Sequence, residues 1–233
     1  MKFDVLTLFP EVFPGTLEIG VVGRALSAGQ ISVEASNLRD WTDGKHRQVD
    51  DIAYGGGPGM VIKPEPLVKA VDHFREADPD VRTILLSPQG RIFTQDVARE
   101  LAQEKHLLLV CGRYQGVDDR ARKHIGEELS LGDYVLSGGE IAAMAVIEAV
   151  ARLVPGVVGS PESLEAETFS QHQSGAFEAP LYTRPAEFAG ESVPEVLRSG
   201  DHAAIEKWRR DQSVENTRRV RPDLLPSNIV PRR

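Results

Sequence analysis

The chain has 233 residues and a formal net charge of −8, and 41% of its residues are hydrophobic, which is enough for one large domain or a main domain with a small one. No stretch is apolar for long enough to cross a bilayer, and the start, "MKFDVLTLFPEVFPG", is a strand pattern with acids and prolines instead of a signal peptide. The single Cys111 excludes an internal disulfide, so we expect a cytoplasmic protein without a membrane partner.

Strand and helix patterns alternate through residues 1–158. Strands are predicted at 3–9, 31–36, 82–87 and 106–111, with a short buried strand at 134–136. Helices are predicted between them at 16–27, 64–76, 94–104, 117–126 and 138–153. This order indicates an α/β fold with a mostly parallel sheet and helices on both of its faces.

The pattern changes after residue 158. Residues 159–179 are polar and lack a sustained period, which is typical of a linker. Residues 180–233 contain a long helical pattern, "DHAAIEKWRRDQSVENTRRV", with Asp201 as its N-cap. We therefore predict an α/β domain at 1–158, a linker at 159–179 and a small all-α domain at 180–233.

Charge is unevenly distributed along the sequence. From Arg198 to Arg233 there are nine Lys and Arg against five Asp and Glu, whereas the rest of the chain is acidic. The segments "KWRR" and "TRRVRP" have the composition of a phosphate-binding surface. A solvated helix face has the same composition, so charge alone leaves both interpretations open.

Four loops carry glycines: "YGGGPGM" (54–60), "LSPQG" (86–90), "CGRYQG" (111–116) and "SLGDYVLSGGE" (130–140). Three of them follow or flank predicted strands, so in a parallel sheet they converge at one edge. Any one alone is also explained as a simple turn. No phosphate-binding motif of the familiar kinds is present, and the apolar Leu131, Val135 and Leu136 suit a flat, largely uncharged group such as adenine.

The whole sequence resembles one known family. The segments that carry the resemblance are, in order, "DVLTLFPEVF", "EIGVVGRA", "RQVDDIAYGGGPGMVIKPEPL", "LLSPQGRIF", "LVCGRYQGVDDR", "LGDYVLSGGE", "RLVPGVVG" and "YTRP". They are similar to the bacterial tRNA (guanine-N1)-methyltransferases, the TrmD type of the SPOUT superfamily. The resemblance implies methylation of the guanosine directly 3′ of the tRNA anticodon, position 37, with S-adenosylmethionine as methyl donor. It also implies a deep C-terminal trefoil knot in the α/β domain, tRNA binding by the C-terminal domain, and a homodimer with active sites between subunits.

Carried over position by position, the resemblance implies contacts with the methyl donor in three loops. These residues are Leu86, Ser87, Pro88, Gln89 and Gly90; Gly112, Arg113 and Tyr114; and Leu131, Gly132, Asp133, Tyr134, Val135, Leu136, Gly138 and Gly139. On this interpretation the glycines allow backbone groups to approach the adenosine while leucines enclose its ring. Ordinary packing at strand ends is the alternative for each residue taken singly.

Methyl transfer to guanine N1 requires removal of the N1 proton and stabilisation of the charge that develops on O6. The family uses an aspartate as base, contributed by the partner subunit, and the matching residue here is Glu167. Glu162 and Glu165 lie in the same segment and could instead all be solvating acids. The matching arginine is Arg152, for which an ion pair with Glu148 is the alternative role.

Gln115 is a second departure, because the family usually has glutamate there. These two departures keep two rival hypotheses open: an RNA-binding protein without turnover, and a methyltransferase acting on a small molecule or another RNA. The family's reaction is associated with Mg²⁺, but the sequence offers no oxygen-ligand cluster and no zinc spacing, so no metal site is assigned.

Overall fold

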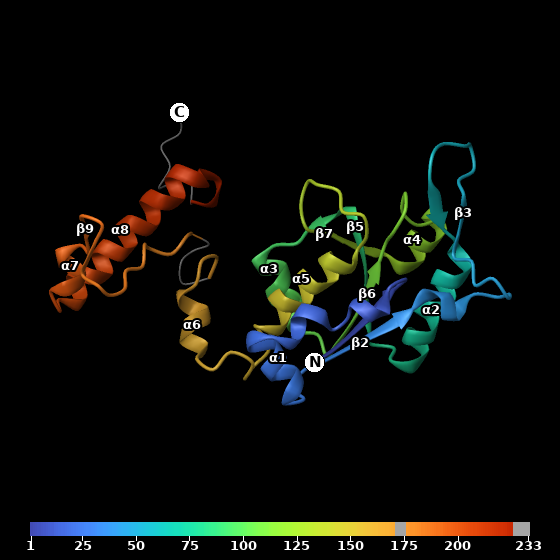
Figure 1. The fold of residues 1–233 in the computed structure, drawn as a ribbon, viewed down its shortest axis with the longest axis horizontal. Coiled ribbons are helices and arrows are strands. Elements are labelled where there is room, and N and C mark those ends of the chain that lie inside the picture. The colour runs from blue at the N-terminus through green and yellow to red at the C-terminus, as the bar shows by residue number, and fades with distance from the viewer. Residues whose placement is uncertain (171–175, 226–233) are drawn as a thin grey trace. The chain divides into compact units, whose positions relative to one another are not determined.

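The structure, a computed structural model, describes residues 1–170 and 176–225. By its internal contacts the chain divides into two units, Met1–Gly159 and Ser160–Arg233, which we describe separately. Figure 1 shows their helices and strands. No helix in these described ranges is long and apolar enough to cross a membrane.

The first unit is built on a five-stranded sheet in the order β2-β1-β6-β5-β7, and every neighbouring pair is parallel. The strands are β1 (Lys2–Thr7), β2 (Ser32–Asn37), β5 (Arg82–Ile92), β6 (His106–Cys111) and β7 (Glu127–Ser130). The central strand β6 is buried along its whole length, as the apolar run "HLLLVC" requires. The predicted α/β fold with a mostly parallel sheet is confirmed.

Helices cover both faces of this sheet. Alternate residues of β6 face opposite sides: Leu107 and Leu109 belong to one core cluster, and Leu108 and Val110 to the other. The first cluster receives α1 (Gly20–Ser27), α3 (Gln95–Leu101) and α5 (Glu140–Ala151). The second receives α2 (Pro64–Ala77), α4 (Asp119–Ile125) and the short helix η3 (Leu38–Trp41). Two further 3₁₀ helices, η1 (Pro10–Val12) and η2 (Gly15–Glu18), precede α1.

The sheet differs from the prediction at its last strand. Residues 134–136 form no strand, and Val135 is 86% exposed. The edge strand is instead β7. Its sequence "EELS" has no apolar pattern that would predict a strand, and only its Leu129 and Ser130 are buried. The partner β5 runs to Ile92, and its register against β7 shifts between Leu86 and Arg91, so the "LSPQG" segment is a bulge inside this strand.

A separate antiparallel pair, β3 (Asp50–Ile52) and β4 (Met60–Ile62), carries the "YGGGPGM" loop. These strands have three residues each, too few for a periodic pattern, and were not predicted from the sequence. Gly55, Gly56, Gly57 and Gly59 all have positive φ, a conformation that few other residues adopt. Glycine in this loop therefore has a conformational function.

The second unit contains α6 (Pro161–Ala166), α7 (Glu195–Arg198), α8 (His202–Val220) and η4 (Pro222–Leu224). Its longest helix begins where predicted, because the Asp201 side chain accepts hydrogen bonds from the first turn. Two details differ from the prediction: α6 forms within the expected linker, and β8 (Glu187–Phe188) pairs with β9 (Glu191–Ser192), so the region is not purely helical. Thr217 of α8 accepts a hydrogen bond from Phe177 N–H at 2.9 Å, which holds the preceding segment to this helix.

Candidate active site

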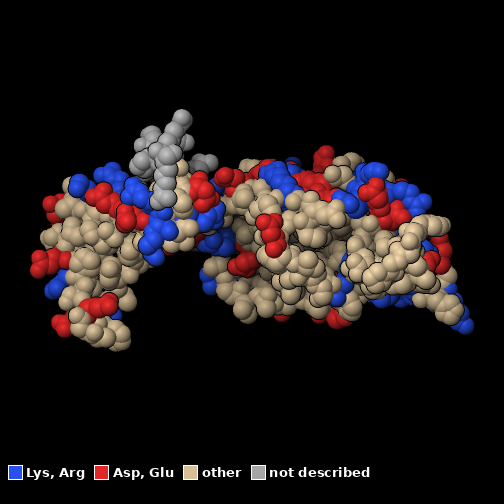
Figure 2. All heavy atoms as spheres, turned by 90° about the horizontal axis from the view of Figure 1, so that it is seen from above, with Lys and Arg blue, Asp and Glu red and all other residues tan. Residues whose placement is uncertain are grey.

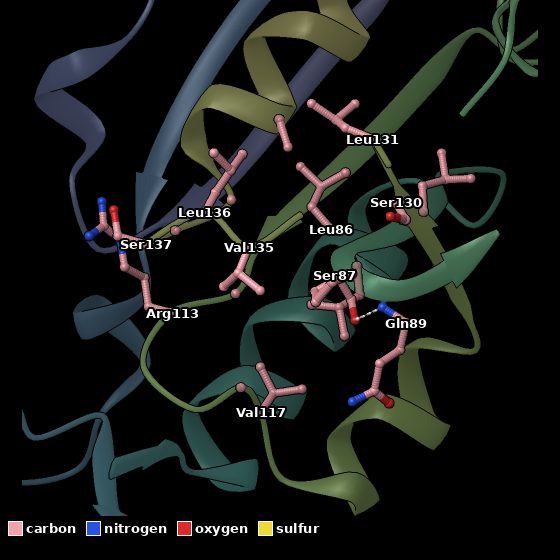
Figure 3. Close-up of a pocket in the computed structure, with 18 of the residues that line it drawn as sticks. Leu86, Ser87, Gln89, Arg113, Val117, Ser130, Leu131, Val135, Leu136 and Ser137 are labelled. Atoms are coloured by element: carbon pink, nitrogen blue, oxygen red, sulfur yellow. Dashed lines mark hydrogen bonds between the residues drawn. The ribbon is translucent and has the colours of Figure 1, made fainter. Parts of the chain in front are cut away.

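A pocket of about 250 Å³ opens at the carboxyl edge of the sheet, where the β5 bulge, the loop after β6 and the loop between β7 and α5 meet (Figure 3). It is lined by every residue that the resemblance implied for methyl-donor contact, except Gly90 and Asp133. The pocket is also lined by residues not predicted from the sequence: Leu85, Gly116, Val117, Arg122, Leu129, Ser130, Ser137 and Ala142. Gly116, Ser130 and Ser137 belong to the glycine loops, and Leu85, Val117 and Leu129 directly adjoin them, so the loops themselves, widened by one residue, would have included these six.

One part of the pocket is apolar. Leu86, Leu131 and Leu136 lie around its inner part in Figure 3, and the buried Leu129 and Ala142 complete this surface. Polar side chains such as Ser87 and Gln89 lie to one side of it. A flat ring enclosed by leucines, with backbone amides and carbonyls at its edge, fits this arrangement.

Two predicted site glycines are explained by close packing of backbones. A Cβ added to Gly90 would lie 2.5 Å from the carbonyl carbon of Glu128 and from Leu129 N, so β5 could not approach β7 at this position with a larger residue. A Cβ added to Gly139 would lie 2.7 Å from Cys111 Cα. The N–H of Gly139 also donates to Gly112 O at 2.9 Å, which fixes the start of α5 against the end of β6.

Gly138 has a different reason to be glycine. A Cβ there would lie 2.2 Å from Arg113 Nε and 2.4 Å from Glu140 Oε2. These two side chains form an ion pair of 3.0 Å beside the pocket, with Glu140 almost completely buried. Gly138 and Gly139 thus leave room for an ion pair and for the end of β6, and both also line the pocket, where their contact with the methyl donor stays a prediction.

Gln115 connects the pocket to the β3–β4 loop. Its backbone N–H donates to Met60 O at 3.0 Å, and its side chain packs so closely on Gly59 that a Cβ there would lie 2.7 Å from Gln115 Cγ. The neighbouring Tyr114 has a positive φ of 61° and a half-exposed side chain. The loop after β6 is therefore held in an unusual conformation at the pocket.

Arg152, one of the two residues predicted for the chemistry, is not among the residues that line this pocket. Arg152 is the C-cap of α5, while Gly139 at the other end of the helix lines the pocket. The twelve residues of α5 separate these ends by roughly 18 Å. Glu167 belongs to the second unit, at the C-cap of α6.

Among the described residues, no three His, Cys, Asp or Glu side chains lie close enough together to hold a metal ion. Near the pocket, a bidentate ion pair with Arg120 lowers the pKa of Asp118, the N-cap of α4. This carboxylate serves the helix start, since it also accepts from Arg120 N–H at 2.9 Å.

Comparison with known proteins agrees with the resemblance. A family model described as "tRNA (Guanine-1)-methyltransferase TrmD" matches residues 1–227. Proteins named tRNA (guanine-N(1)-)-methyltransferase are similar over nearly the whole length: that of Dictyoglomus turgidum is 49% identical over 97% of this chain and 90% of its own length. The Clavibacter sepedonicus protein is 52% identical over 97% of this chain and all of its own. The chain therefore belongs to the TrmD family of tRNA (guanine-N1)-methyltransferases.

Proposed function

We propose that this protein transfers a methyl group from S-adenosylmethionine to N1 of guanosine 37 in tRNA. One observation carries the proposal: three loops far apart in sequence meet in one pocket, and they are the loops to which the family resemblance assigns the methyl donor. The protein is an enzyme of this family, so the pocket is assigned to the donor and the tRNA guanine is the acceptor.

The pocket residues fit S-adenosylmethionine. Leu86, Leu131 and Leu136 give an apolar surface for adenine, and the glycine loops offer backbone groups to its edge and to the ribose. When bound, S-adenosylmethionine supplies a methyl group already activated on a sulfonium. The chain's own residues then have to bind the methyl donor, orient the guanine and remove the proton from guanine N1. Mg²⁺ is left without an assigned site.

For the proton we propose Glu167 as the general base at guanine N1, and for the charge on O6 we propose Arg152. Both are proposed to act in a homodimer, with Glu167 contributed by the second subunit. The length of α5 supports this, because the backbone of Arg152 lies ten residues, roughly 15 Å, beyond Ala142, which lines the pocket of its own chain. Exposed apolar side chains on the first unit, such as Ile141 and Ile19, supply a surface for a second copy.

We also propose the family's trefoil knot and its division of labour. The knot is proposed from membership of the family. The domains are proposed as the knotted donor-binding domain at 1–158, the linker at 159–179 and the tRNA-binding helical domain at 180–233. The basic surplus after Arg198 supports the last assignment. A cytoplasmic location follows from the tRNA substrate.

The test measures methyl transfer to two tRNA transcripts that differ only in having guanosine or adenosine directly 3′ of the anticodon. We expect transfer to N1 of the guanosine transcript alone. Transfer to neither transcript, with intact donor binding, would favour an RNA-binding protein without turnover.

The Glu167→Gln variant tests the assigned base. Its single-turnover rate should fall by about 100-fold or more, with little change in donor affinity, because the side chain acts on the guanine proton. Glu165→Gln is the matched control. A fall with Glu165→Gln but not with Glu167→Gln would move the role to Glu165.

A further inference from the structure

A buried ion pair lies beside the pocket at the first turn of α5. Glu140 Oε2 lies 3.0 Å from Arg113 Nη2 and accepts from Arg113 Nε at 3.1 Å, so one edge of the guanidinium is held by the carboxylate. Thr7, at the end of β1, donates its hydroxyl proton to Glu140 Oε1 at 2.7 Å. The same hydroxyl oxygen accepts from Phe9 N–H at 3.0 Å. Three segments remote in sequence thus meet at one carboxylate.

This arrangement is costly for a structural contact. A buried carboxylate loses its hydration, and a buried ion pair is often no more stable than apolar residues of the same volume. The remainder of α5 is almost wholly apolar, and Gly138 is kept small by the same pair. Stability alone does not explain a charged pair here, which points to a function for the arginine that it holds.

The geometry leaves Arg113 with a defined orientation. Its guanidinium lies over the Phe9 ring, 4.4 Å from the centroid, while Glu140 occupies the Nε and Nη2 edge. No hydrogen bond from Nη1 to a described residue accompanies these contacts, so this edge is available to a ligand. In Figure 3 the side chain lies beside Ser137, on the opposite side of the pocket from Leu131 and Ser130.

We infer that Glu140 and Thr7 are positioning residues which hold Arg113 so that it donates to the O6 and N7 edge of the target guanine, where O6 has a second lone pair for the proposed Arg152; this rests on the proposed function. A guanidinium matches two adjacent acceptors, and guanine presents such a pair at O6 and N7. Adenine presents an amino group in place of O6, so the same arginine disfavours it. The Arg113 side chain lines the pocket and is 27% exposed, so a base arriving from outside can reach it.

The experiment compares Glu140→Gln, Thr7→Val and Thr7→Ser with the wild-type protein. Each variant is measured for S-adenosylhomocysteine affinity by calorimetry and for single-turnover methylation of the guanosine-37 transcript. Glu140→Gln keeps the shape but removes the charge, Thr7→Val removes the hydroxyl, and Thr7→Ser restores it. The control is Glu76→Gln, an exposed residue of α2.

We expect Glu140→Gln and Thr7→Val to lower the single-turnover rate by about 10- to 100-fold, as a displaced orienting group does. Affinity for S-adenosylhomocysteine should stay within about twofold, since the arginine faces the base, and Thr7→Ser should recover most of the rate. If Glu140→Gln does not fold, Thr7→Val and Thr7→Ser still decide between the outcomes.

Two results would overturn the inference. Unchanged single-turnover rates in folded variants would mean that the Arg113–Glu140 pair serves only packing. A loss of S-adenosylhomocysteine affinity as large as the loss of rate would mean that Arg113 binds the methyl donor. Failure of the proposed function is distinct, because the wild-type protein would then transfer no methyl group to the transcript.

Discussion

At the scale of single residues, burial controls the chemistry of Cys111, the last residue of β6. Burial raises the pKa of its thiol well above the ordinary value, the charge of Glu140 raises it further, and Arg113 opposes both. The thiol is therefore neutral in the folded protein and does not react with reagents that require the thiolate as nucleophile. Its position against Gly139 makes it a packing residue of the pocket wall.

We expect thiol reagents to modify Cys111 at pH 8 only as fast as the protein unfolds. The unfolded thiol ionises near pH 8.5, while the folded thiol keeps its proton. The free energy of unfolding should therefore fall as pH rises above that value, relative to Cys111→Ala. Urea unfolding of both proteins at pH 7.5 and 9.5 measures this difference. A difference independent of pH would contradict the raised pKa.

Close backbone packing gives a second prediction for a single residue. Gly139→Ala places a methyl group against Cys111 Cα, so we expect a loss of about 1 to 3 kcal/mol in the free energy of unfolding. Gly159→Ala is the matched control, because its Cβ meets nothing within 4 Å, and it should be neutral or slightly stabilising. Chemical denaturation measures both, and equal effects would contradict the packing argument.

At the scale of elements, α8 carries five of the ten Lys and Arg residues of the second unit, but they are not equivalent. Arg209 pairs with Glu206 at 3.0 Å and Arg218 with Glu215 at 2.8 Å, whereas no described acidic side chain pairs with Arg210. Figure 2 shows basic and acidic side chains interspersed on this unit rather than one continuous basic surface. Local pairing thus decides how much positive charge is left for phosphates.

We therefore expect Arg210→Ala to reduce the slope of log tRNA affinity against log salt by about 0.7 to 0.9, the value for one phosphate contact. Arg209→Ala should change it less, since Glu206 already neutralises this charge in part. Binding titrations at several salt concentrations measure both slopes. Unchanged slopes would mean that α8 is a solvated face, which is the other interpretation of its composition.

At the scale of the whole molecule, the first unit exposes large apolar side chains. Ile141 on α5 is 64% exposed and Ile19 is 71% exposed, within a unit whose sheet is otherwise well covered. Exposed apolar residues on a helix that also forms the pocket suggest a contact with a second copy. The role proposed for Arg152 also requires a second copy, since this residue does not line the pocket of its own chain.

We expect the wild-type protein to sediment as a dimer at micromolar concentration and Ile141→Glu to sediment as a monomer without methyl transfer, because a charge opposes apolar contact. Ile52→Glu, a similarly exposed position on β3, should remain dimeric and active. A fully active monomeric wild-type protein would contradict both the dimer and the role of Arg152.

Elements with local signals can be predicted from the sequence alone. The alternation in 3–9, the apolar run 106–111 and the Asp201 cap were each read correctly, because period and capping depend on neighbours in the chain. The sequence also predicted that three glycine loops meet at one edge of the sheet, since parallel strands place their carboxyl ends together, and these three loops line the pocket.

The last strand, the loop over the pocket and the ion pair beside it could not be predicted from the sequence, because they depend on residues that are distant along the chain. β7 is a strand through its pairing with β5, and residues 134–136, apolar but exposed, are a loop over the pocket. The Glu140 carboxylate joins Arg113, 27 residues away, to Thr7, 133 residues away, and no periodicity reports such a contact. Gly90 and Gly138 owe their identity to neighbours that the fold alone supplies, since the atoms filling the place of a Cβ belong to β7 and to this ion pair.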